Sequence, residues 1–209
     1  YGAVMLGNPI SRLYLTMFTA MMVLTSDIYI PYFLQTLHGV TPLVSGYLVA
    51  LVALGWTIAA FFSASFSGRQ AVVAIVRGCI LETAATASLI PFLATNTPFD
   101  TLARFAPAVI AMFLMGFGVG LGWAHLVTKI IGIARKTEQD KASAAISMTQ
   151  SLGGAFGAAL AGVIVNGAGL THPGGIAGGI SAATWLYALM AIPGLIAIAL
   201  SLTIKPASA

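Results

Sequence analysis

Residues 105–132, FAPAVIAMFLMGFGVGLGWAHLVTKIIG, form an apolar stretch in which only His125 and Lys129 can carry a charge. About 20 apolar helical residues, rising about 1.5 Å each, cross the roughly 30 Å hydrocarbon core of a bilayer. Five other stretches have the same character, so the predicted spans are 13–35, 43–66, 71–94, 105–132, 143–166 and 181–204. Because both faces of each stretch are apolar, helices fit better than barrel strands. The sequence predicts an all-α membrane protein with six transmembrane helices.

The composition excludes a water-soluble domain. Hydrophobic residues make up 59% of the chain, charged residues 7%, and the mean hydropathy is +0.99. A soluble domain with this balance would aggregate. The net charge of +4 does not indicate nucleic acid, because the basic residues stand at span ends rather than in one solvated patch. We therefore expect the lipid bilayer, and no nucleic acid, as a partner.

Metal, cofactor and enzymatic sites are not expected. The single cysteine, Cys79, stands inside the third span. No metal-ligand spacing connects the three histidines, which are His38, His125 and His172. A short serine cluster lacks a suitably placed histidine partner for catalysis; it comprises Ser63, Ser65 and Ser67. The sequence thus predicts no metal, no cofactor and no enzyme activity.

Basic residues gather on one side of the predicted spans. The opposite loops carry only Arg104, whereas the side of the termini carries Arg12, Arg69, Arg135, Lys136, Lys141 and Lys205. The positive-inside rule then places both termini in the cytoplasm. We expect the bundle to lie in the plasma (inner) membrane. We expect 1–12 to be a cytoplasmic segment, 13–204 the bundle and 205–209 a cytoplasmic tail. Because the chain begins at Tyr1, we expect a missing upstream part, either a few residues or an entire amino-terminal half.

Glycines recur at helical spacing in the fourth and fifth spans. They form small-xxx-small patterns and are Gly116, Gly118, Gly120, Gly122, Gly153, Gly154 and Gly157. In lipid, such residues let helix backbones approach closely, so the pattern predicts packing against protein. Easier helix bending is the alternative use. Spans one to three resemble spans four to six only weakly, which leaves a 3+3 inverted repeat open.

Asp27 lies near the middle of the first span, followed at helical spacing by Pro31 and Gln35. An ionisable side chain in hydrocarbon costs at least about 2.5 kcal/mol on insertion scales, so it should face protein or water and have a task. Proline here leaves a carbonyl near Asp27 unpaired and favours a kink. We interpret Asp27 as a proton carrier that competes with a cationic substrate. The alternative is a structural ion pair with Arg77.

Two more ionisable residues stand in the third span. Arg77 and Glu82 are about 140° apart around a helix, so they should face different partners. We interpret Glu82 as a second proton-coupling residue and Arg77 as charge-compensating. In the fourth span, we expect Lys129 to reach the headgroups. His125 is interpreted as a substrate-binding residue, with a hydrogen-bonded packing role as the alternative.

Aromatic and polar side chains near mid-span suit a cavity for a flat apolar cation, through stacking and cation-π contacts. The predicted substrate-binding residues are Tyr29, Tyr32, Gln35, Trp56, Trp123, His125 and Gln150, with Asn166 as a further candidate. Trp185 and Tyr187 stand near a predicted span end, and we interpret them as interfacial anchors.

Two segments resemble a known family. Residues 27–46, DIYIPYFLQTLHGVTPLVSG, resemble the first helix of the carboxy-terminal half in fourteen-helix drug:proton antiporters of the major facilitator superfamily. Residues 142–162, ASAAISMTQSLGGAFGAALAG, are similar to the penultimate helix of that family. The similarity extends over about residues 12–204. It implies a major-facilitator-like half bundle of six helices.

The chain also departs from that family. The conserved loop after the second helix is reduced to Gly68-Arg69-Gln70 and lacks its acidic member, and residues 151–162 lack the proline of the antiporter motif. Both losses suit a second half, yet Asp27-x-Tyr-x-Pro31 is also similar to the first helix of twelve-helix drug antiporters. This mixture of features suits an undivided half-size transporter.

The resemblance implies a secondary active transporter that exports lipophilic or cationic compounds in exchange for protons. One six-helix bundle needs a companion, because substrate sites in such folds lie between two bundles. The expected partners are a second six-helix bundle, most simply a second copy in a homodimer, a small-molecule substrate and protons. The alternatives are the other half of a longer chain as companion, a proton-independent facilitator, and a non-transporting membrane subunit.

Overall fold

The computed structural model describes residues 8–99 and 101–206. Within these ranges no strand is present, and the elements are α1 (Pro9–Leu24), the 3-10 helix η1 (Thr25–Tyr29), α2 (Ile30–His38), α3 (Pro42–Ser63), α4 (Gly68–Ser88), α5 (Ile90–Leu93), α6 (Leu102–Ile133), the 3-10 helix η2 (Lys136–Glu138), α7 (Gln139–Gly167) and α8 (Gly175–Ser201). Six stretches of these described residues are long and apolar enough to cross a membrane: Pro9–His38, Pro42–Ser63, Gly68–Leu93, Phe105–Ile133, Lys136–Gly167 and Gly175–Ser201. The prediction of an all-α fold with six membrane-spanning helices is confirmed.

The span ends differ from the predicted ones, and side-chain capping explains the start of the first helix. The side chain of Asn8 accepts a hydrogen bond from the Ile10 backbone N–H (3.2 Å), and Pro9 fits the first turn, so the first helix begins earlier than residue 13. The last helix begins at Gly175 rather than at 181. Of the predicted flanking segments, 1–7 and 207–209 lie outside the described residues.

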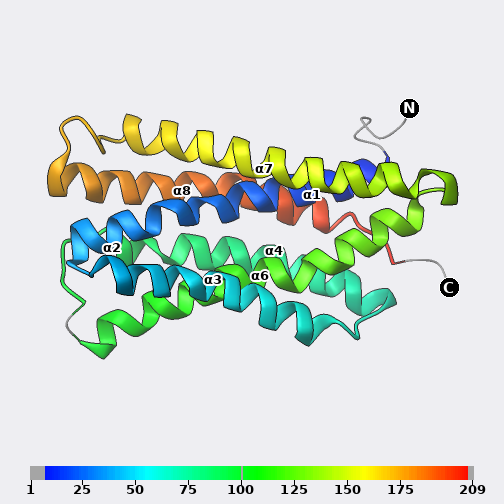
Figure 1. Cartoon of the computed structure of the whole chain (residues 1–209), viewed down its shortest axis with the longest axis horizontal. Coiled ribbons are helices and arrows are strands. Elements are labelled where there is room, and N and C mark those ends of the chain that lie inside the picture. Colours follow the sequence, from blue (N-terminus) through cyan, green and yellow to red (C-terminus); the bar gives the residue numbers. More distant parts are fainter. Residues whose placement is uncertain (1–7, 100, 207–209) are drawn as a thin grey trace.

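The helices form two three-helix layers, one of α1, α7 and α8 and the other of α3, α4 and α6 (Figure 1). In the first layer α1 packs on α7 and α8, in the second α6 packs on α3 and α4, and α4 meets α8 between the layers. If α1 is exchanged with α6, α3 with α7 and α4 with α8, each of these contacts becomes another contact of the same set. These main contacts follow the pattern expected of the 3+3 inverted repeat that the sequence left open, whereas the contact of α7 with α8 has no comparable counterpart between α3 and α4.

One end of the bundle collects the basic residues. The start of α1, the end of α8, the α3–α4 turn and the α6–α7 connection all lie at this end, called here the termini end (Figure 1). The elements there carry Arg12, Arg69, Arg135, Lys136, Lys141 and Lys205. At the opposite end, Arg104 falls in the first turn of α6.

Glycines of α6 set the spacing of the second layer. A Cβ built on Gly116 or Gly120 would meet the backbone of Val52 or Trp56 on α3. On the next face, a Cβ at Gly118 would lie 2.5 Å from the Glu82 backbone nitrogen on α4. One of the interleaved pairs therefore faces α3 and the other faces α4. Gly116, Gly118 and Gly120 leave no room for a side chain, whereas a Cβ at Gly122 would lie 3.1 Å from the Ile75 Cα.

Glycines of α7 likewise allow close backbone approach in the first layer. A Cβ on Gly153 or Gly157 would lie 2.7 Å from the carbonyl oxygens of Phe18 or Met22 on α1. Gly154 is less confined, with the Thr25 hydroxyl as its nearest neighbour, 3.8 Å from the Cβ position. The first-layer contact between α1 and α7 thus also depends on backbone approach.

The first span breaks its α-helix at mid-length. Pro31 has no N–H for the Asp27 carbonyl four residues earlier, and the sequence predicted that a carbonyl would stay unpaired there. That prediction is wrong, because the Ile30 N–H bonds to the Asp27 carbonyl as the chain tightens into η1. The Asp27 carbonyl is satisfied, and Asp27 stands on a short 3-10 segment between α1 and α2.

Candidate functional site

Asp27 occupies the helix break and is half-buried. No ion pair forms among the described residues, so the carboxylate has no cation within salt-bridge distance there. Arg77, its alternative partner, is exposed on α4. A carboxyl group placed at mid-span without a fixed counter-ion is open to a proton or to a passing cation.

Glu82 is the most enclosed acid of the described residues. It is 1% exposed on α4, and its Oε1 atom has no hydrogen-bond partner among them. A small void of about 10 Å³ beside it is bounded by α1, α4 and α6, with Ala20, Gly118 and Trp123 among the lining residues. A carboxylate charge would meet no compensating group here.

Tyr187 is a site residue that sequence reasoning missed. It was interpreted as an interfacial anchor because α8 was expected to begin near it, and this interpretation is wrong. Because α8 begins at Gly175, Tyr187 lies near mid-helix, is 0% exposed and has no hydrogen-bond partner for its hydroxyl among the described residues. The residue lies within electrostatic range of Asp27, and its ring packs edge-on against Phe33 at 6.2 Å between centroids. Reading the Gly174-Gly175 pair as the helix start would have placed it correctly.

The structure brings some predicted substrate residues together. Trp56 on α3 and Trp123 on α6 lie 5.3 Å apart between ring centroids, tilted by 54°, and Trp123 also borders the void beside Glu82. The Tyr29 hydroxyl reaches α7, where it would lie 3.6 Å from a Cβ on Gly162. Gln150 is exposed on α7, and Tyr32, 39% exposed, lies on α2.

Other predicted substrate residues lie elsewhere. The Gln35 side-chain amide donates to the Ser45 hydroxyl (3.1 Å), which ties α2 to the start of α3 near the opposite end. Asn166 is exposed near the end of α7, and its side chain donates to the Gly162 carbonyl (2.8 Å). His125 stacks on Phe66 with 6.3 Å between ring centroids and borders a pocket at the termini end whose lining does not include Asp27.

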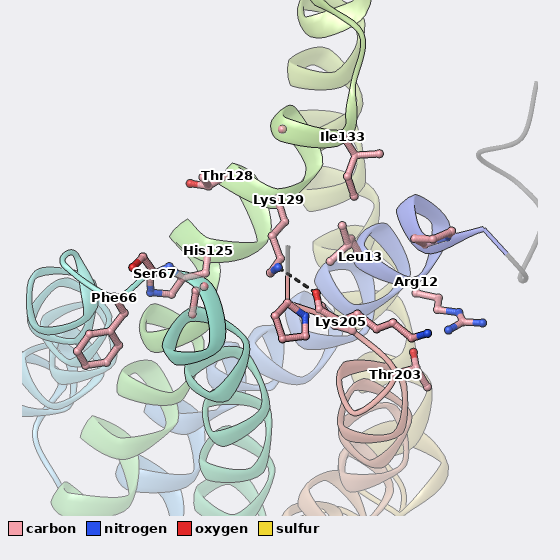
Figure 2. A pocket seen from close by; sticks show the side chains of 16 residues that line it. Arg12, Leu13, Phe66, Ser67, His125, Thr128, Lys129, Ile133, Thr203 and Lys205 are labelled. Carbon is pink, nitrogen blue, oxygen red and sulfur yellow. Dashed lines mark hydrogen bonds between the residues drawn. The ribbon is translucent and has the colours of Figure 1, made fainter. Parts of the chain in front are cut away.

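That pocket was not foreseen from the sequence. It has a volume of about 780 Å³ and lies between the start of α1, the α3–α4 turn, the last turns of α6 and the residues after α8 (Figure 2). Arg12, His125, Lys129 and Lys205 are among its lining residues. No single stretch of sequence signals it, because four separate segments build its wall.

These features define a multi-pass membrane protein with buried acids inside its helix bundle. The chain is similar to curated proteins named as probable multidrug-efflux transporters in two strains of Mycobacterium tuberculosis, with 34% identity over 192 residues, or 91% of this chain. It is also 28% identical, over 144 residues and 68% of its length, to a puromycin resistance protein of Streptomyces alboniger. The chain spans 39% of the length of the first two relatives and 28% of the third. No family model matches it.

Proposed function

We propose that this chain is a major-facilitator-like half bundle that exports lipophilic or cationic compounds in exchange for protons. The observation that carries the proposal is Asp27, a mid-span acid at a helix break with no ion-pair partner among the described residues. Similarity to proteins named for drug efflux and drug resistance supports the choice of substrate class. A transporter rather than an enzyme is the function that these relatives favour.

In the proposed cycle, Asp27 gives up its proton as a cationic compound binds beside it, and regains one after the compound leaves. A carboxylate that already forms an ion pair with a basic side chain binds a proton or a cationic compound poorly. Asp27 forms no such pair with the described residues, so its carboxylate can exchange one for the other. The tilted Trp56–Trp123 pair supplies flat apolar surface for an aromatic compound. The termini end faces the cytoplasm in this proposal, since it carries the basic residues.

Replacing Asp27 tests the proposal directly. In vesicles with an imposed pH gradient, we expect Asp27→Asn to reduce efflux of a fluorescent cation to the level of protein-free vesicles, because the amide cannot carry the proton. Asp140→Asn is the matched control, since Asp140 is an exposed acid in the first turn of α7, and it should export at the wild-type rate. Undiminished gradient-driven efflux in Asp27→Asn would exclude Asp27 as the carrier.

The transport path is proposed to close when a second copy of the bundle docks as a homodimer. The outer spans α3 and α7 are the least buried in the single bundle, since only 28% of the most apolar stretch of each is buried. In addition, α7 exposes polar residues such as Ser147 and Gln150. Two-fold symmetry makes one such surface self-complementary. The greater length of the relatives leaves room within one polypeptide for a second bundle, which is the competing arrangement.

The mass of the detergent-solubilised complex distinguishes the two arrangements. The homodimer predicts protein of twice 21.5 kDa after the detergent contribution is subtracted, in light scattering coupled to size-exclusion chromatography. Efflux should then require both copies, so mixing wild-type protein with excess Asp27→Asn should lower activity more than dilution does. A monomeric mass together with transport by a single copy would contradict the homodimer.

A further inference from the structure

The charged residues that line the pocket at the termini end are all basic. Three fixed cations line it, Arg12 on α1, Lys129 on α6 and Lys205 after α8, and no carboxylate occurs among its described lining residues. Figure 2 shows that these side chains come from three different segments: Lys129 points to the Lys205 backbone, and the Arg12 and Lys205 side chains extend away from Lys129 in this view. We propose that this pocket binds the phosphate headgroup of an acidic phospholipid. The proposal does not depend on the transport function.

The cations retain capacity to bind an anion. The Lys129 ammonium donates one hydrogen bond, to the Lys205 carbonyl oxygen at 3.2 Å, and an ammonium has three N–H groups. Arg12 forms no ion pair with any described residue, and its guanidinium carries five N–H groups. Such charged donors bind a phosphate oxygen about twice as strongly as neutral donors bind neutral acceptors.

His125 adds a second, independent sign of a ligand. It is only 7% exposed, yet its Nε2 atom lacks a hydrogen-bond partner among the described residues. A buried polar atom is normally paired, because leaving it unpaired costs about 1–3 kcal/mol. Because His125 lines the pocket, its ring lies beside any group held there.

Depth and lining favour a lipid over a free anion. Lys129 stands one turn before the end of α6 at Ile133, about 6 Å along the axis, so the cations lie where spans meet headgroups. The rest of the wall is largely apolar, with Leu13, Phe66 and Ile204 among its members. Basic pockets between transmembrane helices bind acidic lipid headgroups, while an apolar wall accepts the glycerol and upper acyl carbons.

Lipid retention by the full chain tests the proposal. The protein is purified in detergent with equal amounts of phosphatidylglycerol and phosphatidylcholine, and the bound lipid is counted by native mass spectrometry. We expect retention of phosphatidylglycerol over phosphatidylcholine. Affinity should fall by about fivefold for each cation removed, in Lys205→Gln and again in the double variant Arg12→Gln/Lys129→Gln. Lys205 follows α8, outside any helix, so its change leaves the fold intact.

A matched double variant separates the pocket from general surface attraction. Lys136→Gln/Lys141→Gln removes the same charge from exposed residues at the same end, outside the pocket, and should retain phosphatidylglycerol as the wild type does. Equal losses in the two double variants would overturn the proposal, as would equal binding of both lipids by the wild type. If inorganic phosphate displaces phosphatidylglycerol at equal concentration, the ligand is a free anion and the lipid assignment fails.

Discussion

The variant Gly120→Ala should lose much of its stability, although it adds only one methyl group. A Cβ at Gly120 would lie 2.8 Å from two backbone atoms of Trp56 and closer still to its carbonyl oxygen. Backbone atoms in a helix cannot turn aside as a flexible side chain can, so α3 and α6 must separate along their contact. We expect a loss of about 3 kcal/mol, the upper end of overpacking costs, and a melting temperature lower by about 6–12 °C in detergent.

Gly132→Ala is the matched control in the same helix. A Cβ there meets nothing within 4 Å, and alanine favours a helix over glycine by about 0.8–1 kcal/mol. This variant should melt at or slightly above the wild-type temperature, measured by the same thermal unfolding assay. Equal melting of the two variants would show that the α3–α6 contact does not require glycine at position 120.

Much of the fold could be predicted from the sequence, because the bilayer makes the length of an apolar stretch nearly sufficient. Six such stretches exist, and the structure has a membrane-length helical stretch at each. The helix ends were harder to predict, since they depend on the residues at each helix start. Asn8 and Pro9 start the first helix earlier, and Gly174 and Gly175, both with positive φ, start the last one before residue 181.

The candidate site was harder to predict, for a related reason. An error of six residues at the start of α8 moved Tyr187 from mid-span to an expected interface, so a buried hydroxyl near Asp27 was overlooked. The pocket at the termini end joins Arg12 and Lys205, which stand at opposite ends of the sequence. Helical periodicity describes one helix at a time, whereas these groupings follow from how different helices pack.

Glu82→Gln should abolish proton coupling while leaving the bundle intact. Amide and carboxyl groups have nearly the same shape, so the packing of α4 against Gly118 and Trp123 on α6 is kept. Because Oε1 accepts no hydrogen bond from the described residues, the free energy of unfolding should change by less than about 1 kcal/mol, the size of one ordinary hydrogen bond. Gradient-driven efflux should nevertheless fall to background, since an amide cannot release a proton.

The split between stability and transport is what distinguishes a proton carrier from a structural acid. A structural role predicts the reverse result for Glu82→Gln, a lowered melting temperature with coupled efflux preserved in whatever protein remains folded. Glu138→Gln, at an exposed acid in η2, controls for the loss of one carboxyl group and should match the wild type in both measurements. Substrate exchange without a pH gradient is a third measurement. A variant that still binds substrate but cannot carry protons should retain this exchange. Loss of exchange together with efflux would instead assign Glu82 to substrate binding.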